Sequence, residues 1–160
     1  MNLEKLKKEI DKINPAEIKK LKKMVLGSPN VIIIGNGGSN SVASHTAQDY
    51  TKRLKTRTIS FSDPSRLTCY INDYGMENAY AQFVSEFSDP DTLVILISSS
   101  GESVNILNVA EHCYAADINF VVLSGFKSDY GHKAVLDFWV DSNDYGIVEI
   151  VHQIILHAII

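Results

Sequence analysis

The chain has 160 residues, 45% hydrophobic and 21% charged, which excludes a disordered or fibrous chain and predicts one globular domain with a sizeable core. The net charge is −4, but residues 1–23 hold eight lysines against four acidic residues. These lysines alternate with a regular apolar stripe and have no aromatic residues among them. A solvated helix face is therefore favoured over a nucleic-acid site. No apolar run approaches membrane-spanning length, and the N-terminus lacks the apolar core of a secretory signal. Cys69 and Cys113 form no C-x-x-C pair. These features together favour a protein of the reduced cytoplasm.

The first predicted element is a helical hairpin over residues 1–27. Apolar residues recur there at spacings of three and four, which is typical of an amphipathic helix, at Leu3, Leu6, Ile10 and Ile13. Asn14 and Pro15 are the expected N-cap and first residue of a second helix, which Gly27 ends. The hairpin packs either on its own domain or on another subunit, and the sequence leaves both open.

Residues 31–160 alternate predicted strands with predicted helices. Strands are expected at residues 31–34, 57–61, 93–97, 120–123 and 138–140. Helices are expected at residues 41–54, 65–70, 76–87, 103–116 and 145–160. This alternation predicts an α/β fold with a doubly wound, mostly parallel sheet. We therefore expect a single domain over residues 1–160, with the hairpin at 1–27 and the α/β core at 31–160.

The first core strand runs directly into a glycine-rich turn made of Gly35, Asn36, Gly37, Gly38 and Ser39. A strand, a glycine turn and a helix N-terminus together form a geometry that binds phosphate, because amide hydrogens and the helix dipole both face the anion. An ordinary tight turn is the alternative. The G-x-G-x-x-G fingerprint fails at Asn40 and no Gly-Lys-Ser/Thr follows, so general nucleotide binding is disfavoured.

A second polar turn follows the strand at residues 93–97 and reads Ser98, Ser99, Ser100, Gly101, Glu102 and Ser103. Ser103 is expected to cap the next helix, which leaves the other hydroxyls free to face an anion. Ligands of doubly wound sheets bind beyond the carboxyl ends of the strands. Two such turns at one edge of the sheet therefore predict an anion-binding site there.

Two helices carry ionisable residues in a pattern. His45 and Asp49 are four residues apart and share a helix face. The last helix is almost wholly apolar except for one stripe that contains Glu149, His152, Gln153 and His157. A core histidine with satisfied hydrogen bonds is the usual explanation for a single such residue, but a stripe opposite a second His/Asp pair favours a functional site. Its chemistry suits a divalent metal, zinc first, or proton transfer. His112 and His132 have no obvious companion, and surface roles are expected.

These segments together resemble the sugar isomerase (SIS) domain, and within it the phosphoheptose isomerase group. The resemblance spans nearly the whole chain. It implies a five-stranded parallel sheet and a cytoplasmic homotetramer with active sites between subunits. The implied reaction interconverts sedoheptulose 7-phosphate and D-glycero-D-manno-heptose 7-phosphate, for the heptose of bacterial surface polysaccharide.

The resemblance also implies roles for individual residues. Asp49 matches the general base and His157 the partner acid. The remaining substrate contacts, including the phosphate site, are implied at Asn36, Gly37, Gly38, Ser39, Arg53, Asp73, Ser98, Ser99, Ser100, Ser103 and Glu149. Some members of the group bind zinc through positions that match His45, Asp49, Glu149 and His157.

The chain departs from the group at two of these positions. The usual base is glutamate, and Asp49 is one methylene shorter; Glu149 stands where glutamine is typical and adds a negative charge. The main hypothesis is an isomerase of a seven-carbon sugar phosphate. The alternative is a non-catalytic SIS protein that binds a sugar phosphate as a regulator or scaffold.

Overall fold

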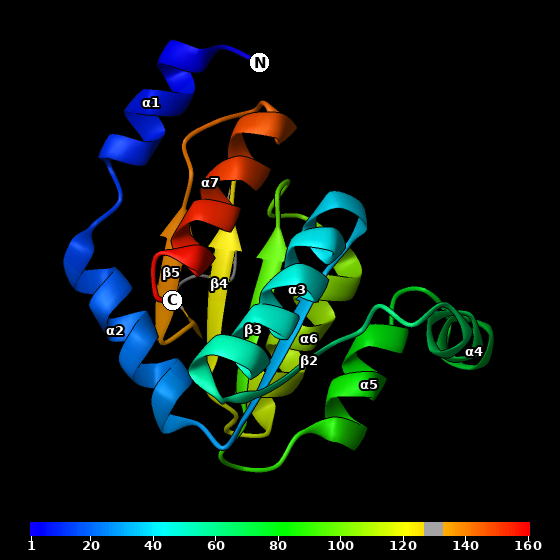
Figure 1. The fold of residues 1–160 in the computed structure, drawn as a ribbon. Coiled ribbons are helices and arrows are strands. Elements are labelled where there is room, and N and C mark those ends of the chain that lie inside the picture. Colours follow the sequence, from blue (N-terminus) through cyan, green and yellow to red (C-terminus); the bar gives the residue numbers. More distant parts are fainter. Residues whose placement is uncertain (127–132) are drawn as a thin grey trace.

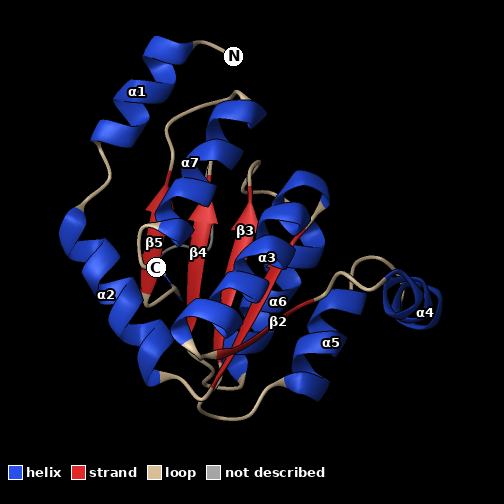
Figure 2. Ribbon diagram, in the orientation of Figure 1, coloured by secondary structure: helices blue, strands red, loops and turns tan. Residues whose placement is uncertain are grey.

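A computed structural model describes residues 1–126 and 133–160; His132 lies outside them. The chain forms a central sheet covered by helices on both faces (Figure 1; Figure 2). The strands are β1 (Asn30–Gly35), β2 (Arg57–Ser60), β3 (Leu93–Ser98), β4 (Phe120–Ser124) and β5 (Leu136–Trp139). The helices are α1 (Leu3–Asp11), α2 (Pro15–Gly27), α3 (Gly37–Asp49), the π-helical segment Tyr50–Leu54, α4 (Pro64–Tyr74), α5 (Ala79–Phe87), α6 (Val104–Ala115) and α7 (Tyr145–His157).

The sheet has the order β2-β1-β3-β4-β5 and all of its strand pairs are parallel. The predicted doubly wound parallel sheet is therefore confirmed. The order reverses direction at β1, since β2 lies on one side of it and β3 on the other. The carboxyl ends of β1 and β3 are side by side at this switch point, with Gly35 opposite Ile97. This is where an open α/β sheet binds its ligand.

Two apolar cores flank the sheet because successive strand residues point to opposite faces. In β1, Val31 and Ile33 face the core beneath α2, α3 and α7. Ile32 and Ile34 face the other core, beneath α5 and α6. All four residues are at most 1% exposed. Burial on both faces explains why the strand is a continuous apolar run.

Helices α1 and α2 follow one another along one side of the molecule and do not fold back as the predicted hairpin (Figure 1). Helix α2 packs on its own domain. Leu21 and Val25 of α2 are completely buried in the core beneath α3 and α7. The side chain of Asn14 accepts a hydrogen bond from the Ala16 N–H, and Pro15 is the first residue of α2, which confirms the predicted start. Among the described residues, no helix is both long and apolar enough to cross a membrane.

Helix α4 differs from the other core helices. None of its residues is fully buried, and it extends to Tyr74, beyond the helical segment predicted over residues 65–70. In Figure 1 it stands at the side of the molecule opposite α1 and α2. It reaches the domain through aromatic contacts, as Tyr70 meets the ring of Phe61 edge-on at 5.4 Å. Asp73 is carried on this outlying helix.

Candidate active site

The two polar turns meet at the carboxyl edge of the sheet. The Ser39 and Ser99 hydroxyls are 3.3 Å apart in a buried contact. The amide of Asn36 exchanges two hydrogen bonds with that of Asn105 in the first turn of α6, at 2.9 and 2.8 Å. Sequence reasoning did not single out Asn105, although a polar residue two places after Ser103 in an otherwise apolar helix start was a usable signal. These contacts join the loops after β1 and β3 into one surface.

The glycine turn is shorter than predicted. Helix α3 begins at Gly37 and not at residue 41, so the glycines form its first turn. Gly37 has φ +50°, a conformation that favours glycine. A Cβ on Gly35 would lie 2.7 to 2.8 Å from atoms of Ser39, so the strand can approach the helix only without a side chain there. The helix N-terminus therefore lies directly against the end of β1.

The loop after β3 leaves hydroxyls available. Ser98 is 3% exposed and its Oγ has no hydrogen-bond partner among the described residues. The Ser100 hydroxyl accepts a hydrogen bond from the Glu102 N–H at 3.2 Å. A buried hydroxyl without a partner costs free energy that a hydrogen bond to a polar ligand can offset.

The prediction that Ser103 caps α6 is wrong for its side chain. Ser103 occupies the N-cap position, but its hydroxyl makes no capping bond. The Ser103 carbonyl oxygen accepts from the N–H groups of Ile106 and Leu107, each at 2.9 Å, as an N-cap carbonyl does whether or not its side chain also caps. Both the hydroxyl and the earlier amides of α6 therefore stay free for an anion.

His45, Asp49 and His157 form a compact cluster between α3 and α7. One ligand atom of each lies within 4.8 Å of the others. The Asp49 Oδ2 is 3.2 Å from the His157 Nε2 and 3.6 Å from the His45 Nε2. The two imidazole rings stack with centroids 5.2 Å apart. The α3 pair and the end of α7 are thus brought together as the sequence pattern indicated.

The hydrogen bonds of His157 define what the cluster can do. Its Nδ1–H donates to the Gln153 carbonyl oxygen at 3.0 Å. This orientation turns the Nε2 of the ring toward the Asp49 carboxylate, with whose Oδ2 it makes a hydrogen bond at 3.2 Å. Two electron-rich atoms at that separation are stabilised by a proton or a cation held between them. The cluster therefore suits both proton transfer and a divalent metal, and its two nitrogens and one carboxylate fit the donor set of a zinc site with an open position.

Glu149 does not belong to this cluster. It precedes His157 by eight residues on α7, about 12 Å along the helix at 1.5 Å per residue. Its carboxylate lies instead against Gly38, where a Cβ would come within 2.4 and 2.5 Å of the two oxygens. The structure thus separates Glu149 from the three other residues of the expected zinc set and places it beside the glycine turn.

His152 faces the core and not the cluster. It is completely buried, its Nε2–H donates to the Ser124 carbonyl oxygen at 3.2 Å, and its Nδ1 has no partner among the described residues. Burial lowers the pKa of His152 to about 4, although the bond to Ser124 opposes the shift. The side chain is therefore neutral at physiological pH.

We expect His152 to weaken the fold in acid. Its pKa is about 4 in the folded chain and about 6.5 in the unfolded chain. The stability that the neutral side chain contributes is therefore fully present above pH 6.5 and is lost as the pH falls toward 4. The loss amounts to about 3 kcal/mol. Urea unfolding of the wild type and of His152→Gln, which keeps an N–H donor, measures the difference. Equal pH dependence of the two proteins over this window would contradict the assignment.

The structure brings neither Arg53 nor Asp73 to the cluster. Arg53 lies on the π-helical segment and is exposed. Asp73 is exposed on α4, where it accepts bonds from Cys69 and Asn72 at 3.5 and 2.9 Å. In Figure 1, α4 and α7 lie on different sides of the molecule.

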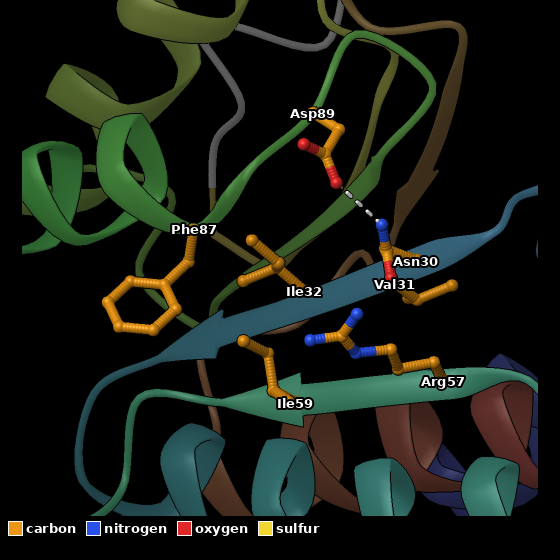
Figure 3. Close-up of a pocket in the computed structure, with 7 residues that line it drawn as sticks. All are labelled: Asn30, Val31, Ile32, Arg57, Ile59, Phe87 and Asp89. Carbon is orange, nitrogen blue, oxygen red and sulfur yellow. Dashed lines mark hydrogen bonds between the residues drawn. The ribbon is translucent and has the colours of Figure 1, made fainter.

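Two surface pockets lie at opposite edges of the sheet. A polar one runs along the outer side of α3 from Gly37 to His45 and Gln48, next to the cluster. The other lies at the amino ends of β1 and β2, remote from the switch point (Figure 3). There Arg57 reaches toward β1, and the Asn30 amide donates to Asp89 at 2.9 Å. Its polar groups are already paired or open to solvent, so we place the active site at the other edge.

Comparison with solved structures identifies the fold. Among solved structures, the chain matches a phosphoheptose isomerase from Neisseria gonorrhoeae with a TM-score of 0.85 and 23% identity, over 96% of this chain and 89% of that one. It also matches the Vibrio vulnificus NanR protein complexed with ManNAc-6P, with a TM-score of 0.76 and 18% identity, over 98% of this chain and 56% of that one. The protein therefore has the sugar isomerase fold.

The sequence comparison is more specific. The phosphoheptose isomerase of Fusobacterium nucleatum is 34% identical over 164 aligned residues, which cover 98% of this chain and 82% of that relative. No protein-family model matches the chain. The chain belongs to the phosphoheptose isomerase family.

Proposed function

We propose that this protein is an aldose–ketose isomerase that interconverts sedoheptulose 7-phosphate and D-glycero-D-manno-heptose 7-phosphate. The observation that carries the proposal is the Asp49–His157 pair, with a carboxylate oxygen 3.2 Å from an imidazole nitrogen. A carboxylate base beside an imidazole acid is what proton transfer between adjacent carbons and their oxygens requires. The relatives named phosphoheptose isomerase support the choice of substrate. We place the reaction in the cytoplasm, as a source of heptose for bacterial surface polysaccharide.

The roles of the two residues follow from their chemistry. Asp49 moves a proton between C1 and C2 of the open-chain sugar, and His157 moves the proton on the adjacent oxygen. The bond from the His157 Nδ1–H to the Gln153 carbonyl fixes the ring so that its Nε2 faces the reacting atoms. The enediolate is negative, and electrostatic support for it lowers the barrier.

The phosphate is assigned to the loop after β3. The free amides at the start of α6 and the hydroxyls of Ser98, Ser99, Ser100 and Ser103 provide donors there. The partnerless Ser98 Oγ supports this placement. The α3 start, with Asn36, Gly37, Gly38 and Ser39, contacts the sugar on the adjacent side.

We further propose that the working unit is a homotetramer whose sites combine two chains. Asp49 comes ten residues after Ser39 on α3, about 15 Å along the helix at 1.5 Å per residue. Ser39 touches the phosphate loop through Ser99. A seven-carbon chain has as many bonds as two residues of extended backbone and spans about 7 Å. A sugar phosphate held by this loop therefore needs the acid–base pair of a neighbouring copy, and the same neighbour can supply Arg53 and Asp73.

A metal ion is part of the proposal, held by His45, Asp49 and His157. Bound there, zinc would act as a Lewis acid toward the sugar oxygens. We expect protein purified without chelator to contain about one zinc per chain. His45→Ala should lose it, because His45 is one of the three ligands of the cluster. Elemental analysis measures the zinc content of both proteins. A metal-free wild type whose thermal stability does not respond to added zinc would contradict the site.

The function is tested by solvent exchange. Purified protein incubated with sedoheptulose 7-phosphate in deuterated water should form the aldose and incorporate deuterium at C2, as followed by NMR. The alternative is a sugar-phosphate-binding regulator, which the likeness to NanR with its bound ManNAc-6P keeps in view. Binding of the sugar phosphate with neither product nor exchange would sink the isomerase and support the regulator.

A further inference from the structure

The direction in which a sugar phosphate binds depends on which of two helix starts takes its phosphate, and the inference drawn here rests on the proposed function. Helices α3 and α6 start at the ends of the neighbouring strands β1 and β3. In both helices the N-cap side chain makes no capping bond, at Asn36 and Ser103 respectively. Each start therefore presents unsatisfied amides and the positive end of a dipole to an anion. On these grounds alone a sugar phosphate could bind in either of two opposite directions.

Glu149 removes this symmetry. The side chain reaches from α7 to the first turn of α3, where its carboxylate oxygens lie over the backbone of Gly38. A side chain on Gly38 would overlap them, so the glycine is what allows the carboxylate to sit there. Among the described residues, Glu149 has no hydrogen-bond or ion-pair partner. Its full negative charge thus faces the start of α3 without a neutralising side chain.

The start of α6 has the opposite character. Its neighbouring acid, Glu102, is exposed, so solvent screens its charge. Among the described residues, the last residue of β3 has a buried hydroxyl without a hydrogen-bond partner, the Ser98 Oγ. A phosphate dianion is attracted there by amides and a hydroxyl, whereas at α3 it would meet a carboxylate at a distance too short for salt to screen.

We propose that Glu149 is a specificity-determining residue that keeps the substrate's phosphate away from α3 and so orients the sugar. The phosphate then binds at α6, and the carbon chain extends over the start of α3. There the carboxylate accepts hydrogen bonds from sugar hydroxyls, which supplies the partners that Glu149 lacks in the free protein. Only this direction presents the carbonyl end of the sugar to the acid–base pair of the neighbouring copy.

The location of inorganic phosphate tests the proposal directly. Crystals of the full chain soaked in inorganic phosphate should hold it at α6 alone in the wild type, and at both α3 and α6 in Glu149→Gln, which keeps the side-chain shape. Glu102→Gln is the matched control, because it removes the same charge beside α6 and should leave α3 empty. Phosphate at α3 in the wild type, or none at α3 in Glu149→Gln and in Glu149→Ala, would overturn the proposal.

Kinetics give a second readout. Reversed binding of sedoheptulose 7-phosphate is unproductive, so Glu149→Gln should lower kcat and KM by a similar factor, twofold or more. Loss of a base would instead lower kcat with little change in KM, and that pattern would contradict an orienting role. The soaking experiment needs no turnover, so it decides the role of Glu149 even if the wild type proves not to be an isomerase.

Discussion

Asp49→Asn should lower kcat by roughly 10²–10⁴-fold while the sugar phosphate still binds. The substitution keeps the shape of the side chain and removes its basicity. The phosphate contacts at the loop after β3 lie about 15 Å away along α3 and are untouched. The free energy of unfolding should change little, because among the described residues the Asp49 carboxylate pairs with two histidines, and one of these, His45, is largely exposed. Steady-state assays measure kcat, and isothermal titration measures the affinity for the sugar phosphate.

Two further variants show whether a loss of activity in Asp49→Asn comes from the loss of the base. Asp91→Asn changes the same chemistry at an exposed loop position before β3 and should leave kcat unchanged. Asp49→Glu lengthens the side chain by one methylene and should retain activity if the carboxylate is the base. Full activity of Asp49→Asn would place the base elsewhere, with Glu149 as the next candidate, because it is the carboxylate beside the sugar-binding turn.

Mixing two inactive variants should restore activity if each site combines two chains. Ser100→Asp places a negative charge in the phosphate loop and should prevent substrate binding, and Asp49→Asn should prevent turnover. In a randomly assembled mixture of equal parts, a site draws an intact loop from one chain and an intact Asp49 from another in about a quarter of cases. We therefore expect about a quarter of the wild-type rate after the two variants are refolded together.

The control for this experiment lies within the cluster. Asp49 and His157 of one chain are 3.2 Å apart and should act as a unit. A mixture of Asp49→Asn with His157→Asn should consequently stay inactive, because every cluster carries one defect or the other. If the mixture of Ser100→Asp with Asp49→Asn stays equally inactive, the site lies within one chain, and the roles of Asp49 and His157 must be reassigned.

Local pattern alone was enough to determine the architecture. The apolar runs at residues 31–34 and 93–97 indicate strands buried on both faces, and the parallel sheet confirms them. Asn14 and Pro15 predicted the start of α2 because capping depends only on neighbouring residues. His45 and Asp49 share a face through the helical repeat, which is also a local property.

The sequence did not determine how these groups combine, because that depends on how α3 and α7 pack. The stripe from Glu149 to His157 reads as one polar face, yet in the structure its members meet three surroundings. His157 joins His45 and Asp49, Glu149 lies against Gly38, and His152 enters the core. Helical periodicity states which residues share a side of a helix, but a stripe more than two turns long spans about 12 Å and can meet different neighbours at its two ends.

The same reason explains Ser103 and the distance between the two halves of the site. Whether the Ser103 hydroxyl caps α6 depends on the orientation of that side chain, which residue type does not reveal. The phosphate loop and the acid–base cluster lie at opposite ends of α3, because a helix that follows a parallel strand runs back along the sheet. The residue types of an isomerase are therefore present in the sequence, whereas their separation within one chain appears only in the tertiary structure.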